Sequence, residues 1–452
     1  MRIVEKYTPQ INLIKRISWL SLLTIPPAIV IGGIIALFIR IISRVSLYRF
    51  SNPLVIYILP VAGLISFFVC KAFKEKSSNI VLQNIHEIKA GVSEKSIAPI
   101  FLTAILSHIF GASVGREGSS LQIGAGISRL FDKLYRLKDL YPKELYSTII
   151  IISGIAAAFG AIFGTPVAAA LFALERIKTE RFPYNTFFPC LIASITGSIT
   201  CNYWGMQPSQ FPAIFSSHAN RSLTNNFHLD LLLLAKIVLL GVITGLLSCL
   251  FLFCTKYVRA FAQRWISIPY LIPFVGGMIL VSLVVLTSQY DYLGLGIISP
   301  NAHSSTIASA FTTNGVCNWS WLWKFIFTVI MVGFGFRGGE IVPLLFIGAT
   351  LASVLSFYLH TPVELFVCLG FISIFAAASN TPFACMFLGI ELYGGPYIPY
   401  YLIVCFVAYT FSPSGLDIES EKWISIPKIF DPEYFLYEVK QYLRKNEKHH
   451  SR

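Results

Sequence analysis

Charged residues are scarce in this sequence of 452 residues. Asp, Glu, Lys and Arg make up 13% of it and hydrophobic residues 55%, whereas an ordinary soluble domain is roughly 25% charged. Three stretches, 19–39, 267–290 and 341–363, contain no charged residue, and each reaches the roughly 20 apolar residues that cross a bilayer. The mean hydropathy is +0.69. A soluble protein is excluded, and continuous apolar runs also exclude the alternating strands of a membrane β-barrel. The sequence predicts an all-α polytopic membrane protein.

Metal-binding and common catalytic motifs are also missing. The nine cysteines form no CxxC pair and no cysteine/histidine cluster with zinc spacing, and most lie in apolar runs, where cysteine behaves as a small buried hydrophobe. The sequence contains no P-loop, no HExxH and no EF-hand loop. We therefore expect no metal, no cofactor and no enzymatic activity.

The positive charge indicates membrane topology. The net charge of +13 comes from 35 basic residues that are spread over loops and the tail, so we do not expect a nucleic acid partner. Basic groups at Lys15 and Arg16, in 133–143 and in 422–452 are expected in the cytoplasm by the positive-inside rule. Both termini would then be cytoplasmic, in a multi-pass protein of the cell membrane. The first apolar run is followed by no cleavage signature, so we expect it to be retained.

Two motifs occur twice, in the same order. Residues 111–125 read GASVGREGSSLQIGA, and residues 335–349 read GFRGGEIVPLLFIGA. Residues 164–175 begin with Gly-Thr-Pro and end in Glu, and residues 380–391 begin with Asn-Thr-Pro and end in Glu. Chance similarity between Gly/Ala-rich helices could also explain them, but the shared order favours an internal repeat.

The repeats predict two related membrane halves, 17–206 and 229–416. A linker at 207–228 would join them, with a cytoplasmic N-terminus at 1–16 and a basic cytoplasmic tail at 417–452. Repeated halves whose apolar segments are interrupted by Gly and Pro are typical of transporters that bind substrate near the membrane midplane. We therefore expect function at the interruptions.

The first interruption is Gly115-Arg116-Glu117-Gly118. A helix that starts here would point unpaired N–H groups and the positive end of its dipole at the membrane centre, where they attract an anion. The Glu117 carboxylate could occupy the anion's place, leave it when protonated, and carry the proton as it moves. Alternatively, Glu117 only caps its helix or pairs with Arg116.

The second interruption, 338–343, lies at the matching position and ends in Pro343, which suits a first helical turn. Glu340 is again a carboxylate at a helix start, with capping as its simpler explanation. A third polar group, 76–80, contains Ser78 and Asn79. Their hydroxyl and amide could bind an anion, or could form an ordinary N-cap.

A different class of function is suggested by 111–115, which fits G-x-S-x-G around Ser113 with His108 nearby. That motif belongs to serine hydrolases and requires a preceding strand. The surroundings here are helical, so an intramembrane serine hydrolase is a minor alternative.

Four separated motifs together resemble the CLC family of chloride channels and anion/proton antiporters. They are GREG at 115–118, YLGLG at 292–296, GGEIVPLLFIGA at 338–349 and NTPFACMFLGIEL at 380–392. The resemblance implies a homodimer with one anion pathway per subunit, each built from two inverted halves with interrupted helices that meet at the membrane centre. It also implies that Glu117 is the external gating glutamate.

Within the family, the sequence most resembles the fluoride/proton antiporter branch. Residues 338–343 match that branch's GGE-x-x-P motif, and 77–80 resemble its GNNL-like motif with Asn79 retained. Arg176 follows Glu175 where proton-coupled chloride members have an internal glutamate, which the fluoride branch similarly lacks.

Three positions depart from that branch. Val342 stands where a threonine is common, Ser78 replaces the first asparagine, and the tyrosine expected near the last helix falls close to Asp417. The changes at Val342 and Asp417 each remove a potential donor to the anion, and desolvating a small anion for too few donors is costly.

We therefore predict a secondary transporter that exchanges an inorganic anion, most of all fluoride, for protons, with Glu117 as gate and proton carrier and Glu340 as a second proton site. The predicted anion pathway consists of Ser78, Asn79, Gly115, Gly118, Ile341 and Val342. The expected partners are a halide, protons, the lipid bilayer and a second copy of the chain. The sequence is also compatible with a CLC chloride channel, with a chloride/proton antiporter, and with a homologue that is inactive in transport.

Overall fold

The computed structural model describes residues 2–73, 93–137, 144–176, 184–206, 230–297, 299, 301, 304–395 and 397–412. The predictions for Ser78, Asn79, Asp417, the linker and the basic tail lie outside these residues.

The elements in the described part of the chain are all helices, which confirms the predicted all-α membrane fold. The elements before the linker are α1 (Arg2–Ser51), η1 (Pro53–Ile58), α2 (Leu59–Ala72), η3 (Glu94–Ser96), α4 (Ile97–Ile109), α5 (Glu117–Leu137), α6 (Glu144–Phe163), α7 (Pro166–Glu175) and α8 (Tyr184–Tyr203). Those after it are α9 (Leu231–Trp265), α10 (Leu271–Thr287), α11 (Ile307–Ala310), α12 (Ser320–Gly333), α13 (Ile341–Leu359), α14 (Val363–Ser379), α15 (Pro382–Tyr393) and α16 (Ile398–Thr410).

Several of these helices are long and apolar enough to span a membrane. Within the described ranges they are Ile17–Ser51, Pro53–Ala72, Tyr146–Phe163, Leu231–Trp265 and Ile341–Leu359. The charge-free run 267–290 forms a shorter helix than its length predicts. Helix α10 begins only at Leu271, after Pro269, and ends before Ser288, whose φ of 58° is left-handed.

The same backbone breaks recur before and after the linker. Gly111 lies two residues after α4 with φ 84°, and Gly335 lies two residues after α12 with φ 85°. Gly164 directly follows α6 with φ 68°, and Asn380 directly follows α14 with φ 56°. Glycine and asparagine are the residues that adopt this conformation at least cost, so they end these helices at equivalent points.

Close packing next to the breaks also repeats. A Cβ on Gly124 would lie 2.5 Å from the carbonyl oxygen of Gly154, and a Cβ on Gly348 would lie 2.3 Å from that of Gly370. Helices α5 and α6, like α13 and α14, therefore pack backbone to backbone through glycine pairs, as membrane helices commonly do.

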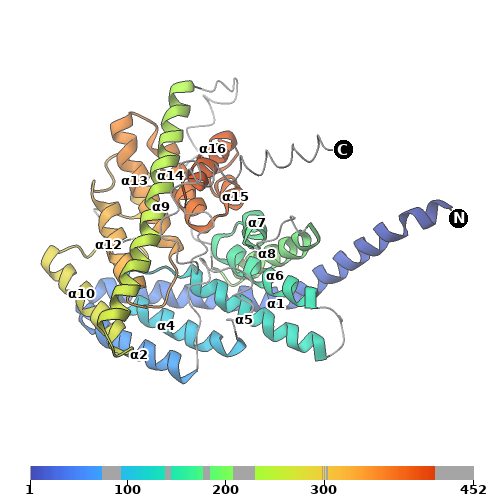
Figure 1. The fold of residues 1–452 in the computed structure, drawn as a ribbon, viewed down its shortest axis with the longest axis horizontal. Coiled ribbons are helices and arrows are strands. Elements are labelled where there is room, and N and C mark those ends of the chain that lie inside the picture. The colour runs from blue at the N-terminus through green and yellow to red at the C-terminus, as the bar shows by residue number, and fades with distance from the viewer. Residues whose placement is uncertain are drawn as a thin grey trace, which may run out of the picture.

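The two sets of helices share one apolar core. In Figure 1 the blue-to-green helices α1 to α8 lie beside the yellow-to-red helices α10 to α16, with α7 next to α15. The ring of Phe172 on α7 stacks on Phe159 of α6 with centroids 4.7 Å apart, and on Phe375 of α14 with centroids 5.8 Å apart. This stack joins α6 and α7 to α14, each of which packs beside a helix that begins at a break.

Candidate functional site at the two helix breaks

The two breaks meet through a pair of backbone hydrogen bonds. The N–H of Gly115 donates to the carbonyl of Gly339, and the N–H of Gly339 donates to the carbonyl of Gly115, both at 2.6 Å. They form an isolated antiparallel bridge. Glycine is needed here because a Cβ on Gly339 would lie 2.6 Å from the backbone nitrogen of Gly118. Segments far apart in the sequence are thereby joined at one point.

Two helices begin beside this bridge. Helix α5 starts at Glu117 and α13 starts at Ile341, each within a predicted interruption. Their first-turn N–H groups have no partner within the helix, and the positive ends of both dipoles lie next to the bridge. Gly118, Ile341 and Val342 are buried in these first turns. Such a pair of helix starts is a place where an anion is stabilised.

Glu117 lies inside this place. Its side chain is fully buried, and neither carboxylate oxygen has a hydrogen-bond partner in the described part of the chain. Its Oε1 lies 3.6 Å from Nε of Arg116. A Cβ on Gly115 would lie 2.6 Å from its Oε2, so the side chain folds back over the bridge.

The surroundings of the Glu117 carboxylate test the two simpler explanations of this residue, which are helix capping and pairing with Arg116. The backbone N–H groups of Arg116, Glu117 and Val342 are close enough to act on it electrostatically. Pairing with Arg116 is thus present, but a capping hydrogen bond is not. The carboxylate occupies a position suited to an anion without being locked there.

Glu340 lies on the other side of the bridge, directly after Gly339. It is 1% exposed and occupies the N-cap position of α13, yet its side chain makes no capping hydrogen bond there. The simple capping explanation therefore does not account for this buried carboxylate.

Two buried cations near the first break were not singled out from the sequence. Nζ of Lys324 donates to the carbonyls of Tyr292 at 3.0 Å and Gly294 at 2.5 Å. Arg49 packs against Gly294, where a Cβ would lie 2.0 Å from its Nη1. Together they hold the YLGLG segment against the break, where the N–H of Gly294 donates to Gly111. A lysine inside an apolar run was the available signal.

The contacts of Ser113 do not favour a hydrolase. Its hydroxyl donates to the carbonyl of Tyr292 at 3.2 Å and is hydrogen-bonded to the hydroxyl of Thr328 at 3.1 Å. Nδ1 of His108 instead lies 2.7 Å from the carbonyl oxygen of Ala104. Helix α4, and not a strand, precedes the serine, so the geometry that the G-x-S-x-G motif requires is not built here.

The repeated glutamates near the ends of α7 and α15 each form hydrogen bonds with the start of the other helix. Glu175, the last residue of α7, accepts hydrogen bonds from the N–H groups of Phe383 and Ala384 at 3.0 and 2.8 Å. Glu391 on α15 accepts from Val167 and Ala168 at 3.0 and 2.9 Å. Each carboxylate thus caps the first turn of the opposite helix.

Arg176 follows Glu175 and joins the same contact between the two sets of helices. Its guanidinium donates to the carbonyl of Ser379 at 2.9 Å. At the position where proton-coupled chloride members are expected to have an internal glutamate, this chain therefore has a cation that crosses to the end of α14.

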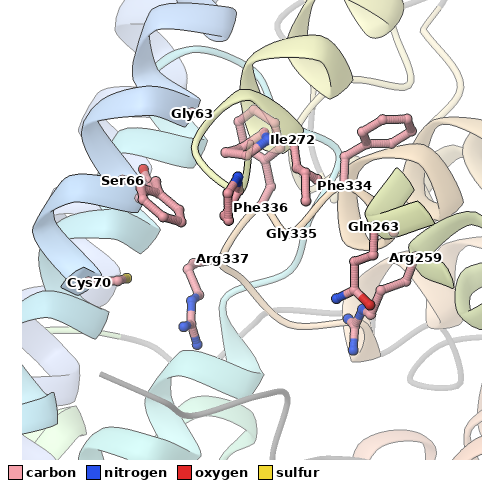
Figure 2. Close-up of a pocket in the computed structure, with 14 residues that line it drawn as sticks. Gly63, Ser66, Cys70, Arg259, Gln263, Ile272, Phe334, Gly335, Phe336 and Arg337 are labelled. Atoms are coloured by element: carbon pink, nitrogen blue, oxygen red, sulfur yellow. The ribbon is translucent and has the colours of Figure 1, made fainter. Parts of the chain in front are cut away.

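A cavity of about 260 Å³ adjoins the second break (Figure 2). Its lining residues come from α2, the end of α9, the start of α10 and the segment that precedes Gly338. They are Gly63, Ser66, Phe67, Cys70, Arg259, Gln263, Pro269, Ile272, Pro273, Gly333, Phe334, Gly335, Phe336 and Arg337. No sequence pattern groups them, because they come from four separate segments.

Solved structures share this fold. The structure of a CLC-type fluoride/proton antiporter is 31% identical, superposes with a TM-score of 0.75, and matches over 86% of this chain and 94% of that one. A slow cyanobacterial Cl⁻/H⁺ antiporter is 18% identical with a TM-score of 0.70, over 87% of this chain and 94% of its own. At that identity the likeness concerns the fold alone.

Sequence comparisons agree. A chloride/fluoride channel protein of Pseudomonas syringae pv. tomato is 32% identical over 413 residues, which cover 89% of this chain and 86% of that protein. Residues 61–413 match the family described as voltage gated chloride channel. Together with the fold and the paired helix breaks, this match shows that the chain belongs to the CLC family of anion transporters.

Proposed function

We propose that this protein exchanges fluoride for protons across the cell membrane, with Glu117 as gate and proton carrier. The observation that carries the proposal is the buried Glu117 carboxylate, which lies between two helix starts near backbone N–H groups of both, and which the described residues do not fix by a well-formed hydrogen bond. When ionised, the carboxylate takes the anion's place. When protonated it no longer gains from the helix dipoles, so it leaves, and an anion replaces it.

Residues of both breaks would form the path. Gly115 and Gly118 allow the backbone to approach the anion, and the first-turn N–H groups of Ile341 and Val342 face it. The Val342 side chain has no hydroxyl, so backbone donors have to replace much of the anion's hydration. Glu340 is the proposed second proton site. Ser78 and Asn79 remain predictions.

The choice of fluoride rests on similarity. Two proteins more than 30% identical to this chain are described as a fluoride/proton antiporter and a chloride/fluoride channel protein. The GGE-x-x-P pattern of 338–343 agrees with the first. The homodimer and the cytoplasmic termini are part of the same proposal and follow from the family resemblance and the positive-inside rule.

Anion efflux from proteoliposomes tests the function. We expect fluoride efflux that drives proton uptake, with little chloride movement, when the two anions are compared side by side and external pH is recorded. Glu117→Gln, which cannot ionise, should abolish proton movement. Glu364→Gln on α14 is the matched control. Unchanged proton movement per anion in the Glu117 variant would refute its role.

A second candidate is an uncoupled channel, because the Pseudomonas syringae relative is described as a channel protein. A channel would pass fluoride or chloride without moving protons, and its flux would follow the membrane potential alone. The same proteoliposome measurement separates the two, since only the exchanger moves protons against their gradient when an anion gradient is imposed.

A further inference from the structure

The cavity beside the second break lies at one edge of the membrane-spanning region. Its lining residues include Arg259 and Gln263 in the last turns of α9. Others come from the second half of α2 and from the start of α10, namely Ser66, Phe67, Cys70, Pro269, Ile272 and Pro273. Helices α2 and α9 end near the cavity, and α10 begins there. The cavity is therefore placed where apolar spans meet water.

Exposed aromatic residues lie on the same turns of α9 and α2 as the lining residues of the cavity. Tyr257, Phe261 and Trp265 on α9 are 58%, 48% and 72% exposed. Phe68 on α2 is 51% exposed and stacks on Tyr270 at 5.8 Å. Tyrosine and tryptophan are enriched at the depth of lipid headgroups, so the cavity opens at headgroup depth.

The polar wall of the cavity is basic. Figure 2 shows Arg337 on one side and Arg259 with Gln263 on the other. Nη2 of Arg259 donates to the carbonyl of Val332 at 3.4 Å, which ties it to the end of α12. None of the 14 lining residues is acidic. The charge of this wall selects an anion.

The size and the second wall of the cavity indicate which anion. Its 260 Å³ equals the liquid volume of roughly nine waters, far more than one fluoride ion fills. Phe67, Pro269 and Ile272 form an apolar side against α2 and α10. Guanidinium groups match phosphate oxygens in pairs, and basic pockets between membrane helices on the cytoplasmic side bind anionic headgroups.

We propose that this cavity binds the phosphate of an anionic phospholipid in the leaflet that the positive-inside rule predicts to be cytoplasmic. The cavity also contacts Gly333 to Arg337, and Arg337 directly precedes Gly338 and Gly339. A bound headgroup therefore holds the segment that ends at the Gly115–Gly339 bridge, and lipid occupancy sets the transport rate. This effect on rate rests on the proposed transport function, whereas binding does not.

Binding is tested first, by native mass spectrometry of the full-length protein in detergent with added phosphatidylglycerol. We expect Arg259→Gln combined with Arg337→Gln to weaken retention by roughly 100-fold or more, because each lost charged hydrogen bond alone accounts for about tenfold. Arg264→Gln removes one positive charge from α9 outside the cavity and should leave retention unchanged. Arg259→Lys with Arg337→Lys should retain an intermediate affinity. Equal retention by wild type and the double Gln variant overturns the proposal.

Transport is then compared in phosphatidylcholine vesicles with and without phosphatidylglycerol. We expect phosphatidylglycerol to accelerate wild type and Arg264→Gln severalfold and to leave the double variant unchanged. Acceleration of wild type by inorganic phosphate in pure phosphatidylcholine would show that the ligand of the cavity is a soluble phosphate and not a lipid. A higher fluoride KM of the double variant in both lipids would make the cavity an anion entrance. Either result overturns the lipid assignment, and absent flux in all samples with intact binding counts against transport only.

Discussion

Gly115 leaves room for the carboxylate that we assign as the gate. A Cβ at this position would lie 2.6 Å from Oε2 of Glu117 and 3.1 Å from both the Gly339 carbonyl oxygen and Cδ of Pro343. The carboxylate is the one flexible group among these neighbours, so it is the one that has to move. A single methyl group would thus exclude Glu117 from the place proposed for the anion.

We expect Gly115→Ala to slow anion/proton exchange by roughly 10- to 100-fold, because small displacements of a reacting group have effects of that size. Gly395→Ala is the control, since its Cβ would meet only Ile398 at 3.9 Å. Both variants should elute as monodisperse protein. Wild-type exchange by Gly115→Ala would show that the carboxylate works from another position.

Single functional residues could be predicted where a charged residue stands alone in an apolar stretch of the sequence. Glu117 and Glu340 are carboxylates next to glycines in apolar surroundings, and both are buried at helix starts as expected. Arg49 and Arg259 carried no such signal, because a basic residue near the end of a span is also an ordinary topology signal. Only their packing against other segments reveals their contacts.

At the scale of elements, α7 and α15 are held together by two exchanged caps. Each carboxylate accepts two N–H groups. A glutamine has one acceptor oxygen and places an NH₂ donor against the second N–H. The substitution therefore leaves a donor unsatisfied at the start of the opposite helix.

We expect Glu175→Gln and Glu391→Gln each to destabilise the protein by about 1–3 kcal/mol. The Tm of the detergent-solubilised protein would fall in each variant and fall further in the double variant, because the two caps use separate donors. Glu364→Gln should leave the Tm unchanged. A loss confined to one of the two variants would contradict equivalent roles.

The repeat at the element scale was visible in the sequence, but its geometry was not. Spacing related 164–175 to 380–391 and predicted a helix in each. That each helix caps the other depends on antiparallel contact between segments more than 200 residues apart. No local pattern specifies such pairing. The bridge between Gly115 and Gly339 could not be predicted for the same reason.

For the whole molecule, the proposed orientation places the loop before α12 outside the cell. Cys317 lies in that loop and is exposed, whereas Cys70 lies at the cavity near the end of α2. The basic residues near the end of α9, which include Arg259 and Arg264, favour the cytoplasm for the cavity side. The two cysteines would therefore face opposite compartments.

We expect a membrane-impermeant maleimide applied to intact cells to label Cys317. Labelling should disappear in Cys317→Ser, and Cys70 should react only after the membrane is opened. Protection of Cys317 in intact cells, with reaction after lysis, would reverse the orientation and place both predicted cytoplasmic termini outside.

The paired hydrogen bonds between Gly115 and Gly339 also limit how alternating access can arise. Transporters with repeated halves commonly alternate by rocking one half against the other around a central site. Here the segments before α5 and before α13 are joined by their main chains at that site. Rocking would break both bonds in a buried place, where each unpaired backbone group costs about 1–3 kcal/mol. The least costly cycle keeps the backbone stationary and rotates one side chain. The group that closes the pathway would then be the side chain of a single glutamate, and no helix would have to move.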